Sequence, residues 1–159
     1  MFTQTTYSKD LSANYVMLSK QLDALLTGEK NAIANLSNAS ALLNQFFDQI
    51  NWVGFYLMED GELVLGPFQG LPACVRIPLG RGVCGTAAKT KETVIVPDVH
   101  AFPGHIACDA ASQSEIVVPI VKNGELLGVL DIDSPIKERF SEQDKEGLEQ
   151  FIQVLIKYI

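Results

Sequence analysis

The dipeptide Asn123-Gly124 lies between two apolar runs, residues 116–122 and 125–133. Asn-Gly is the strongest short signal for a two-residue β-hairpin turn, because both positions readily adopt the positive φ that such a turn requires. The dipeptide therefore predicts that the two runs are antiparallel strands and neighbours in one sheet. Any fold for this chain must contain that pair.

A second hairpin is predicted around the turn 59–61, Glu-Asp-Gly. The run before it alternates with a period of two, which places Trp52 and Tyr56 on one face and Val53 and Phe55 on the other. Turn-forming residues bound each remaining apolar run. The further expected strands are residues 51–58, 62–68, 75–77 and 93–97.

Helical periodicity occurs at both ends of the chain. Apolar residues recur at three- and four-residue steps, and Ser141 followed by acidic residues is a helix start. The order is helix, helix, five or six strands with loop insertions, then helix, which predicts an α+β domain with a largely antiparallel sheet over residues 1–159. The expected helices are residues 10–28, 32–47 and 141–156, with a short one at 86–89.

Composition narrows the functional classes. A chain of 159 residues with 47% hydrophobic side chains can bury a core without cross-links. Its net charge of -7 disfavours nucleic acid as a partner, because polyanions are repelled. The N-terminus lacks the features of a signal peptide, and no apolar run approaches the roughly 18 residues of a membrane span. We therefore expect a cytoplasmic protein with no membrane partner.

All three cysteines, Cys74, Cys84 and Cys108, lie in one segment of the chain together with both histidines, His100 and His105. The surrounding Gly- and Pro-rich stretches predict loops that can bring thiols together. An odd number of cysteines in a reducing compartment argues against a fixed disulfide framework. The sequence separations of 10 and 24, with no Cys-x-x-Cys pair, are unlike structural zinc sites, so no metal is expected. The histidines are most simply loop residues held by hydrogen bonds.

Cys84 precedes the short helix and allows two interpretations. A buried, inert thiol is one of them. If the side chain is exposed, the helix N-terminus would lower its pKa and make it an alternative resolving thiol.

Three acids point to a site on the sheet. Asp131 and Asp133 are two residues apart on a strand and so share a face, and Glu115 can reach the same end of the sheet. They are either solvated strand ends, or a pocket that receives a cationic group and raises the pKa of one acid until it donates a proton. Trp52 and Tyr56 are either a core pair or the apolar wall of that pocket.

Several of these stretches resemble a known family. Residues 80–87, 96–99, 118–120 and 128–134 look like the GAF domain. Residues 51–56 and 105–109, with the three cysteines, more narrowly resemble the free methionine-(R)-sulfoxide reductase family. The similarity runs from about Tyr7 to the C-terminus.

The resemblance implies a six-stranded antiparallel GAF fold, often a homodimer, that reduces free methionine sulfoxide with thioredoxin as the reductant. It implies that Cys108 is the attacking thiol and Cys74 the recycling thiol. It also implies that Trp52, Glu115, Asp131 and Asp133 hold the substrate.

The chemistry agrees with this resemblance. A thiolate attacks the sulfoxide sulfur while an acid, Glu115 or Asp133, protonates the departing oxygen, and Asp131 stays ionised near the ammonium group. The resulting sulfenic acid condenses with a second thiol, so no cofactor is needed. The alternative is a GAF domain that binds a small ligand or senses redox state without turnover.

Overall fold

The computed structural model describes residues 2–106 and 108–159, so Ala107 in the motif at 105–109 lies outside the described residues. The described part contains helices α1 (Leu11–Leu26), α2 (Ala32–Phe46), α3 (Gly82–Thr90) and α4 (Glu142–Leu155). A single turn of 3-10 helix, η1 (Val99–Ala101), follows the fourth strand. The strands are β1 (Trp52–Glu59), β2 (Glu62–Gly70), β3 (Arg76–Pro78), β4 (Val94–Val96), β5 (Ser114–Lys122) and β6 (Glu125–Ser134).

The strands form one sheet in the order β3-β2-β1-β6-β5-β4, and every neighbouring pair is antiparallel. Asn123 and Gly124 have φ values of 53° and 79° and connect the paired residues Lys122 and Glu125. The predicted hairpin and the predicted α+β class with a six-stranded antiparallel sheet are therefore confirmed.

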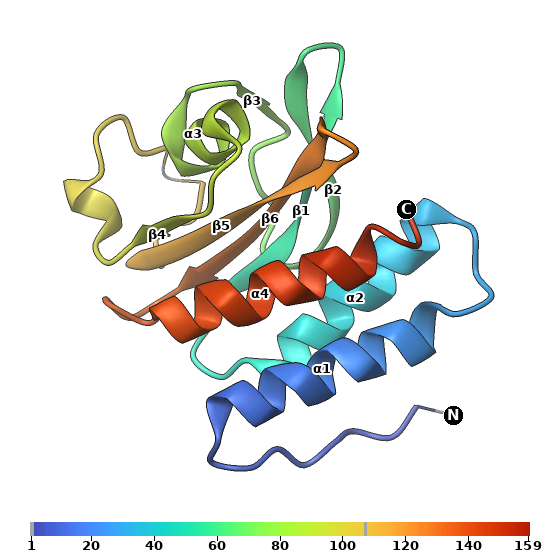
Figure 1. The fold of residues 1–159 in the computed structure, drawn as a ribbon. Helices are drawn as coiled ribbons and strands as arrows, with labels where there is room; N and C mark the ends of the chain where they lie inside the picture. Colours follow the sequence, from blue (N-terminus) through green and yellow to red (C-terminus); the bar gives the residue numbers. More distant parts are fainter. Residues whose placement is uncertain (1, 107) are drawn as a thin grey trace.

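Helices α1, α2 and α4 cover one face of the sheet, whereas α3 and the long connections lie on the other (Figure 1). We call these the helical face and the pocket face. Val53, Phe55 and Leu130 point into the helical-face core, where they meet the apolar sides of the three helices. Trp52, Tyr56 and the buried side of α3 belong to a separate cluster on the pocket face. The predicted alternation of side chains along β1 is confirmed.

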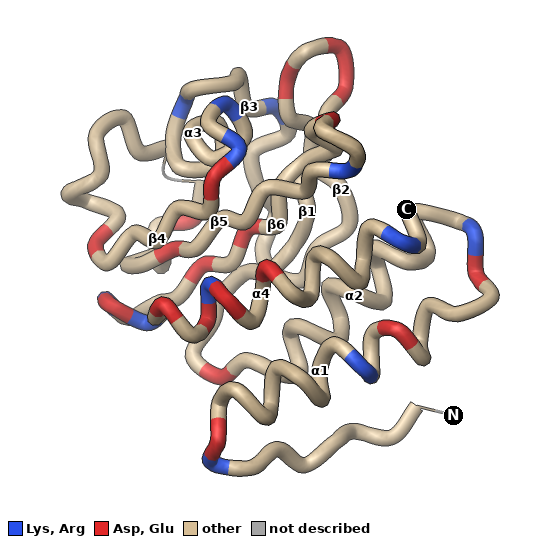
Figure 2. Tube along the Cα trace, viewed as in Figure 1, with Lys and Arg blue, Asp and Glu red and all other residues tan. Residues whose placement is uncertain are grey.

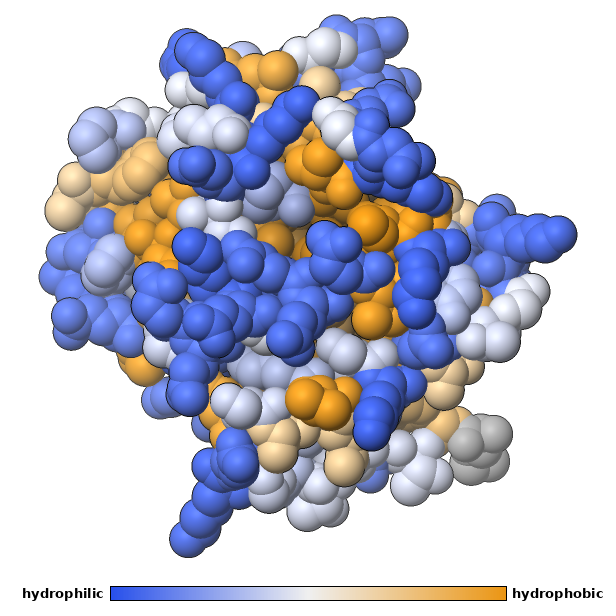
Figure 3. All heavy atoms as spheres, viewed as in Figure 1, coloured by the Kyte–Doolittle hydropathy of each residue, from blue (hydrophilic) through white to orange (hydrophobic). Residues whose placement is uncertain are grey.

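The helical layer is joined by one buried polar contact. Ser141 is the N-cap of α4, as the sequence predicts, and it forms a capping box with Asp144. The Tyr15 hydroxyl of α1 donates a 2.7 Å hydrogen bond to Asp144 Oδ1, and Gly147 leaves room for the Tyr15 ring. The outer side of α4 is hydrophilic (Figure 3), and the apolar side of the helix packs into the core.

Helix α3 differs from the prediction, because it begins at Gly82 and includes Cys84, which was expected in a loop. The glycines in this stretch serve close packing of the helix. A Cβ at Gly85 would lie 2.5 Å from the carbonyl oxygen of Pro78. Gly80 N–H also donates to the Gly85 carbonyl at 2.7 Å, which holds the preceding turn against the helix.

Candidate active site

A cavity opens on the pocket face between the sheet, α3 and the segments on either side of Cys108. Trp52 and Tyr56 of β1, Glu115 of β5 and both aspartates of β6 line it. Cys84 and Cys108 line it as well, and Cys74 is joined to Cys108. The structure therefore brings all eight predicted site residues to one place.

Strand register gathers the three acids. Glu115 of β5 lies directly opposite Asp133 of β6, and β1 places Trp52 opposite Asp133 on its other side. Asp131 follows on the same face of β6, opposite Gly54. Glu115 and Asp131 are only 5% and 6% exposed, so these are not solvated strand ends.

Burial separates the acids into two protonation states. Removal from water raises the pKa of Glu115 well above its usual range, and the charges of Asp131 and Asp133 raise it further. The pKa of Asp133 is also raised well above its usual range, by burial and then by Asp131 and Asp109. Burial raises the pKa of Asp131 to about 6, while hydrogen bonds from Glu115 and Cys84 oppose that rise. At neutral pH Asp131 is therefore the ionised member of a largely protonated group.

One acceptor in this group has no partner. Asp131 Oδ1 is buried and makes no hydrogen bond with the described residues. A buried, ionised carboxylate normally binds hydrogen-bond donors or a cation. The empty acceptor therefore suits a cationic donor of a ligand in the cavity.

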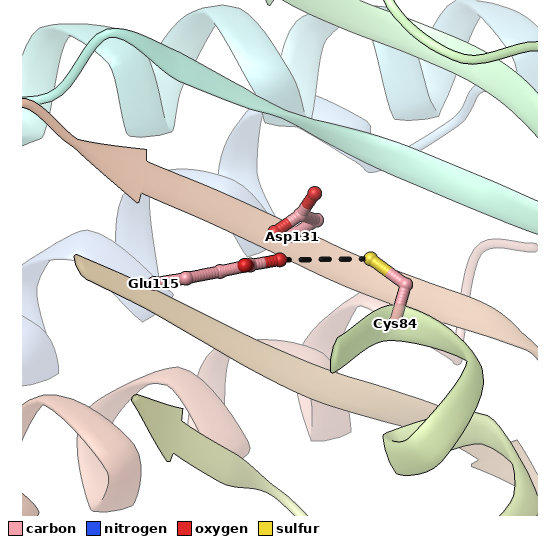
Figure 4. A group of neighbouring side chains, drawn as sticks. All are labelled: Cys84, Glu115 and Asp131. Carbon is pink, nitrogen blue, oxygen red and sulfur yellow. Dashed lines mark hydrogen bonds between the residues drawn. The ribbon is translucent and has the colours of Figure 1, made fainter. Parts of the chain in front are cut away.

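Cys84 approaches the acids from α3, with its thiol directed at Glu115 Oε1 over 3.9 Å (Figure 4). Its side chain is buried, and burial followed by the charge of Asp131 raises the pKa of the thiol. The pKa lowering expected of an exposed position at the helix start does not occur, because the condition of exposure is not met. Cys84 remains a protonated thiol on the cavity floor.

Among the described residues, the group whose spacing comes nearest to that of a metal site is Cys84, Glu115 and Asp131. One ligand atom from each lies within 4.8 Å of the others. Zinc ligands at about 2.0–2.3 Å from the ion lie roughly 3.3–3.8 Å apart, so a zinc ion would draw the more widely spaced of these atoms closer. The arrangement fits an organic ammonium group better, because hydrogen bonds to nitrogen are longer than metal bonds.

The aromatic residues form a wall that holds the neighbouring segment. Trp52 stacks on Tyr56 and on Phe68, with ring centroids 5.8 Å and 5.2 Å apart. Trp52 Nε1 donates to the Leu71 carbonyl at 3.1 Å, and the Tyr56 hydroxyl donates to the Cys74 carbonyl at 2.9 Å. The wall therefore fixes the backbone that carries Cys74.

Gly70 permits this arrangement. Its φ is 141°, and a Cβ there would lie 2.5 Å from Trp52 Cδ1. A larger residue would push the segment away from the wall.

Cys74 and Cys108 form a disulfide with their Cα atoms 5.6 Å apart and a sequence separation of 34. Cys74 follows β2, and Cys108 lies in the connection between η1 and β5. Both are partly exposed, whereas the free Cys84 is buried. The expected Cys74–Cys108 pairing is thus present in the structure.

The sequence prediction missed several cavity residues. His105 Nε2 lies 3.8 Å from Glu115 Oε2, and burial followed by the charge of His100 lowers the pKa of His105. Asn51 Nδ2 donates to Asp109 Oδ2 at 2.9 Å and to Ser112 Oγ at 3.1 Å. Residues 51–56 and 105–109 carry the family resemblance, and that signal could have indicated Asn51, His105 and Asp109.

Arg81 was also missed as a site residue. It lines the cavity, and it is the N-cap of α3 without a side-chain capping bond. A lone arginine between two glycines carries no signal of its own.

Comparison with known proteins identifies the family to which this chain belongs. Residues 24–157 match the GAF domain family. A protein of Escherichia coli named free methionine-R-sulfoxide reductase is 54% identical over 145 residues, which cover 91% of this chain and 88% of that protein. The chain belongs to the free methionine-R-sulfoxide reductase family of GAF domain proteins.

Solved structures of the same family share the whole fold. The free methionine-R-sulfoxide reductase of Neisseria meningitidis, solved in complex with its substrate, has a TM-score of 0.94 and 44% identity, covering 99% of this chain and 95% of that one. The fRMsr of Staphylococcus aureus, also in complex with substrate, has a TM-score of 0.88 and 57% identity, with 97% and 99% covered.

Proposed function

We propose that this member of the family reduces free L-methionine-(R)-sulfoxide to L-methionine, with Cys108 as the attacking thiol. The observation that carries the proposal is the cavity itself, in which Cys108 meets buried acids and an aromatic wall. The names of its relatives, two of them solved with their substrate, support the same reaction.

Substrate recognition follows from the charges around the cavity. Asp131, with a pKa of about 6 and an unpartnered Oδ1, receives the ammonium group of the amino acid. Arg81 is a cavity-lining cation suited to the carboxylate. The stacked rings of Trp52 and Tyr56 pack against the methyl-sulfur end. A methionine sulfoxide within a polypeptide has neither charged terminus, so the site selects the free amino acid.

In the reductive step, the Cys108 thiolate attacks the sulfoxide sulfur. The attack forms a bond between Cys108 sulfur and the substrate sulfur, and Glu115 or Asp133 protonates the substrate oxygen. That hydroxyl then moves to Cys108 sulfur as the S–O bond and the new S–S bond both break, and the S–S electron pair stays on methionine. Both acids have a raised pKa and therefore hold a proton to donate at neutral pH. The products are methionine and a Cys108 sulfenic acid.

In the recycling step, the Cys74 thiol condenses with that sulfenic acid and releases water, forming the Cys74–Cys108 disulfide. We assign this step to Cys74 and not to Cys84, because burial raises the pKa of Cys84 and keeps it a thiol. Thioredoxin then supplies two electrons to restore both thiols. No metal or organic cofactor enters these steps.

A coupled assay tests the proposal. NADPH consumption is followed with thioredoxin, thioredoxin reductase and the separated R and S sulfoxides of free methionine, with N-acetylmethionine sulfoxide as the blocked-terminus control. We expect turnover of the free R isomer alone. Tight binding of that isomer without turnover would contradict the proposal and favour a ligand-sensing GAF domain.

Two further expectations remain predictions: a homodimer and a cytoplasmic location. Sedimentation equilibrium would measure the first, and cell fractionation the second. Among the described residues, no helix has the length and apolar character needed to cross a membrane.

A further inference from the structure

Two exposed apolar side chains, Leu71 and Val75, flank Cys74 in the sequence. Eight large hydrophobic residues are exposed in the described part of the chain, and Leu71, Val75 and Leu79 are three of them. Leu71 is 64% exposed and Val75 is 61% exposed, the two highest values in that set. Clustered exposed apolar groups on a folded domain commonly mark an interaction site.

The charge of the same segment is opposite to that of the whole protein. Residues 63–91 contain no Asp or Glu and four cations, in a chain with net charge -7. Blue segments accordingly gather around β3 and α3 in Figure 2. Arg76 lies two residues after Cys74 in the sequence, and the side chain of Lys89 lies beside Gly80. Arg76 Nη1 also forms a 2.8 Å ion pair with Glu62 Oε1, so its charge is partly compensated. The segment on either side of Cys74 is thus apolar, with more cations than anions.

We infer that this Cys74 surface, formed by Leu71 and Val75 and followed by Arg76, is the docking site of a protein dithiol with an acidic contact face. The attacking cysteine of that partner joins Cys74 and releases Cys108. The inference rests on the proposed function, which requires an external dithiol to reach one sulfur of the disulfide.

The electrostatics select Cys74 as the sulfur attacked. The attacking group is a thiolate, and the nearby cations attract an anion. Cys108 instead has Asp109 as its neighbour, a cavity-lining acid that accepts a hydrogen bond from Asn51 Nδ2. Attack on Cys74 also leaves Cys108 as the free thiolate, the group required for the next turnover.

The bonds and electrons balance. The partner's thiolate forms an S–S bond with Cys74 as the Cys74–Cys108 bond breaks, and the electron pair leaves on Cys108 sulfur. The partner's second thiol then attacks its own mixed disulfide and releases Cys74. The partner is oxidised by two electrons and this chain is reduced by two.

Val75→Glu is the main test variant, because Val75 does not line the cavity and its side chain faces solvent. Its matched control is Ile33→Glu, at a residue 57% exposed on α2. Val75→Lys keeps a long side chain with the opposite charge. Each variant is assayed with thioredoxin and, separately, with dithiothreitol.

We expect Val75→Glu to lower kcat/KM for thioredoxin about ten-fold, as for a central interface residue, and Val75→Lys to lower it less. Turnover driven by dithiothreitol should change less than about two-fold in both Val75 variants. For Ile33→Glu, turnover with either reductant should change less than about two-fold. If Val75→Glu affects the thioredoxin assay no more than Ile33→Glu does, the inference is wrong. Failure of the wild type with both reductants would instead refute the proposed function.

A trapping experiment tests the sulfur attacked. Thioredoxin whose second active-site cysteine is replaced with Ser is mixed with the oxidised protein, and the mixed disulfide is mapped by mass spectrometry. Attachment at Cys74 supports the inference. Attachment mainly at Cys108 overturns it.

Discussion

The two faces of the sheet share three strands, but only the pocket face buries acids among its apolar side chains. On the helical face, β1, β5 and β6 contribute apolar residues such as Phe55, Ile116 and Ile132, which pack against three helices. On the pocket face, β5 and β6 contribute Glu115, Asp131 and Asp133 beside a smaller apolar cluster that includes Trp52 and Tyr56 of β1. Alternation along a strand lets adjacent residues serve these two environments.

The difference separates stability from chemistry. Apolar burial on the helical face stabilises the fold, whereas acids removed from water on the pocket face oppose folding when they ionise. The site therefore depends on the opposite face to hold it together. Substitutions on the two faces should accordingly have different signatures.

The largest effect is expected for Cys108→Ser on the pocket face. Without the attacking thiol, the reduced protein should release no methionine in a single turnover without reductant. Cys74→Ser is the matched control, since it removes the same disulfide but should keep the single-turnover burst and lose thioredoxin-driven cycling. Stoichiometric methionine from Cys108→Ser would refute the assignment.

The next effect concerns the proton donor. Glu115→Gln and Asp133→Asn should slow methionine formation at saturating substrate by roughly 10² to 10⁴, the range expected of a general acid. Rapid-quench rates across pH measure this. Unchanged rates in both variants would mean that the proton comes from another group and that these carboxylates only bind.

The opposite signature is expected on the helical face. Leu22 is fully buried in α1, so Leu22→Ala should lower the free energy of unfolding by about 2–5 kcal/mol. Denaturant titration measures this loss, and kcat at 25 °C should stay near wild type while the protein is folded. Ile33→Ala, on the exposed side of α2, should change stability by less than about 0.5 kcal/mol. A large fall in kcat for folded Leu22→Ala would show that the two faces are not separable.

The smallest effect is on the pH dependence of stability. Folding raises the pKa of Asp131 from 3.8 to about 6, so the folded state holds the proton more tightly than the unfolded state. The contribution of this protonation to the free energy of unfolding is fully present below about pH 4 and is lost as pH rises through about 6. Asp131→Asn removes this loss, and should gain up to about 3 kcal/mol relative to wild type between pH 4 and 7. Parallel unfolding curves for the two proteins over that range would contradict the buried charge. The same variant should raise KM more than it lowers kcat.

Local pattern was sufficient to predict which residues share a face. The period of two placed Asp131 with Asp133, and the Asn-Gly turn paired their strand with β5. The position of Glu115 required more. A register shift between Ile120 and Val121 leaves one extra residue on β6, and this shift places Glu115 opposite Asp133. Uninterrupted pairing from the turn would have set it opposite Ile132, on the other face.

The other omissions have related causes. Gly82 and Gly85 were interpreted as loop residues because glycine is common in turns. Here the small size of Gly85 lets α3 lie against β3, and Gly82 adopts a φ of 62° beside Ile106. His105 and Arg81 reach the cavity from segments far apart in sequence. Such positions depend on tertiary packing, which periodicity does not encode.

One measurement tests the central claim most directly: a single turnover of the reduced wild type with free methionine-(R)-sulfoxide, in which methionine and disulfides are counted in the same sample. The account predicts one methionine per chain, formed together with one Cys74–Cys108 bridge, and neither product from the S isomer. Methionine without that bridge, or a predominant Cys84–Cys108 bridge, would contradict it.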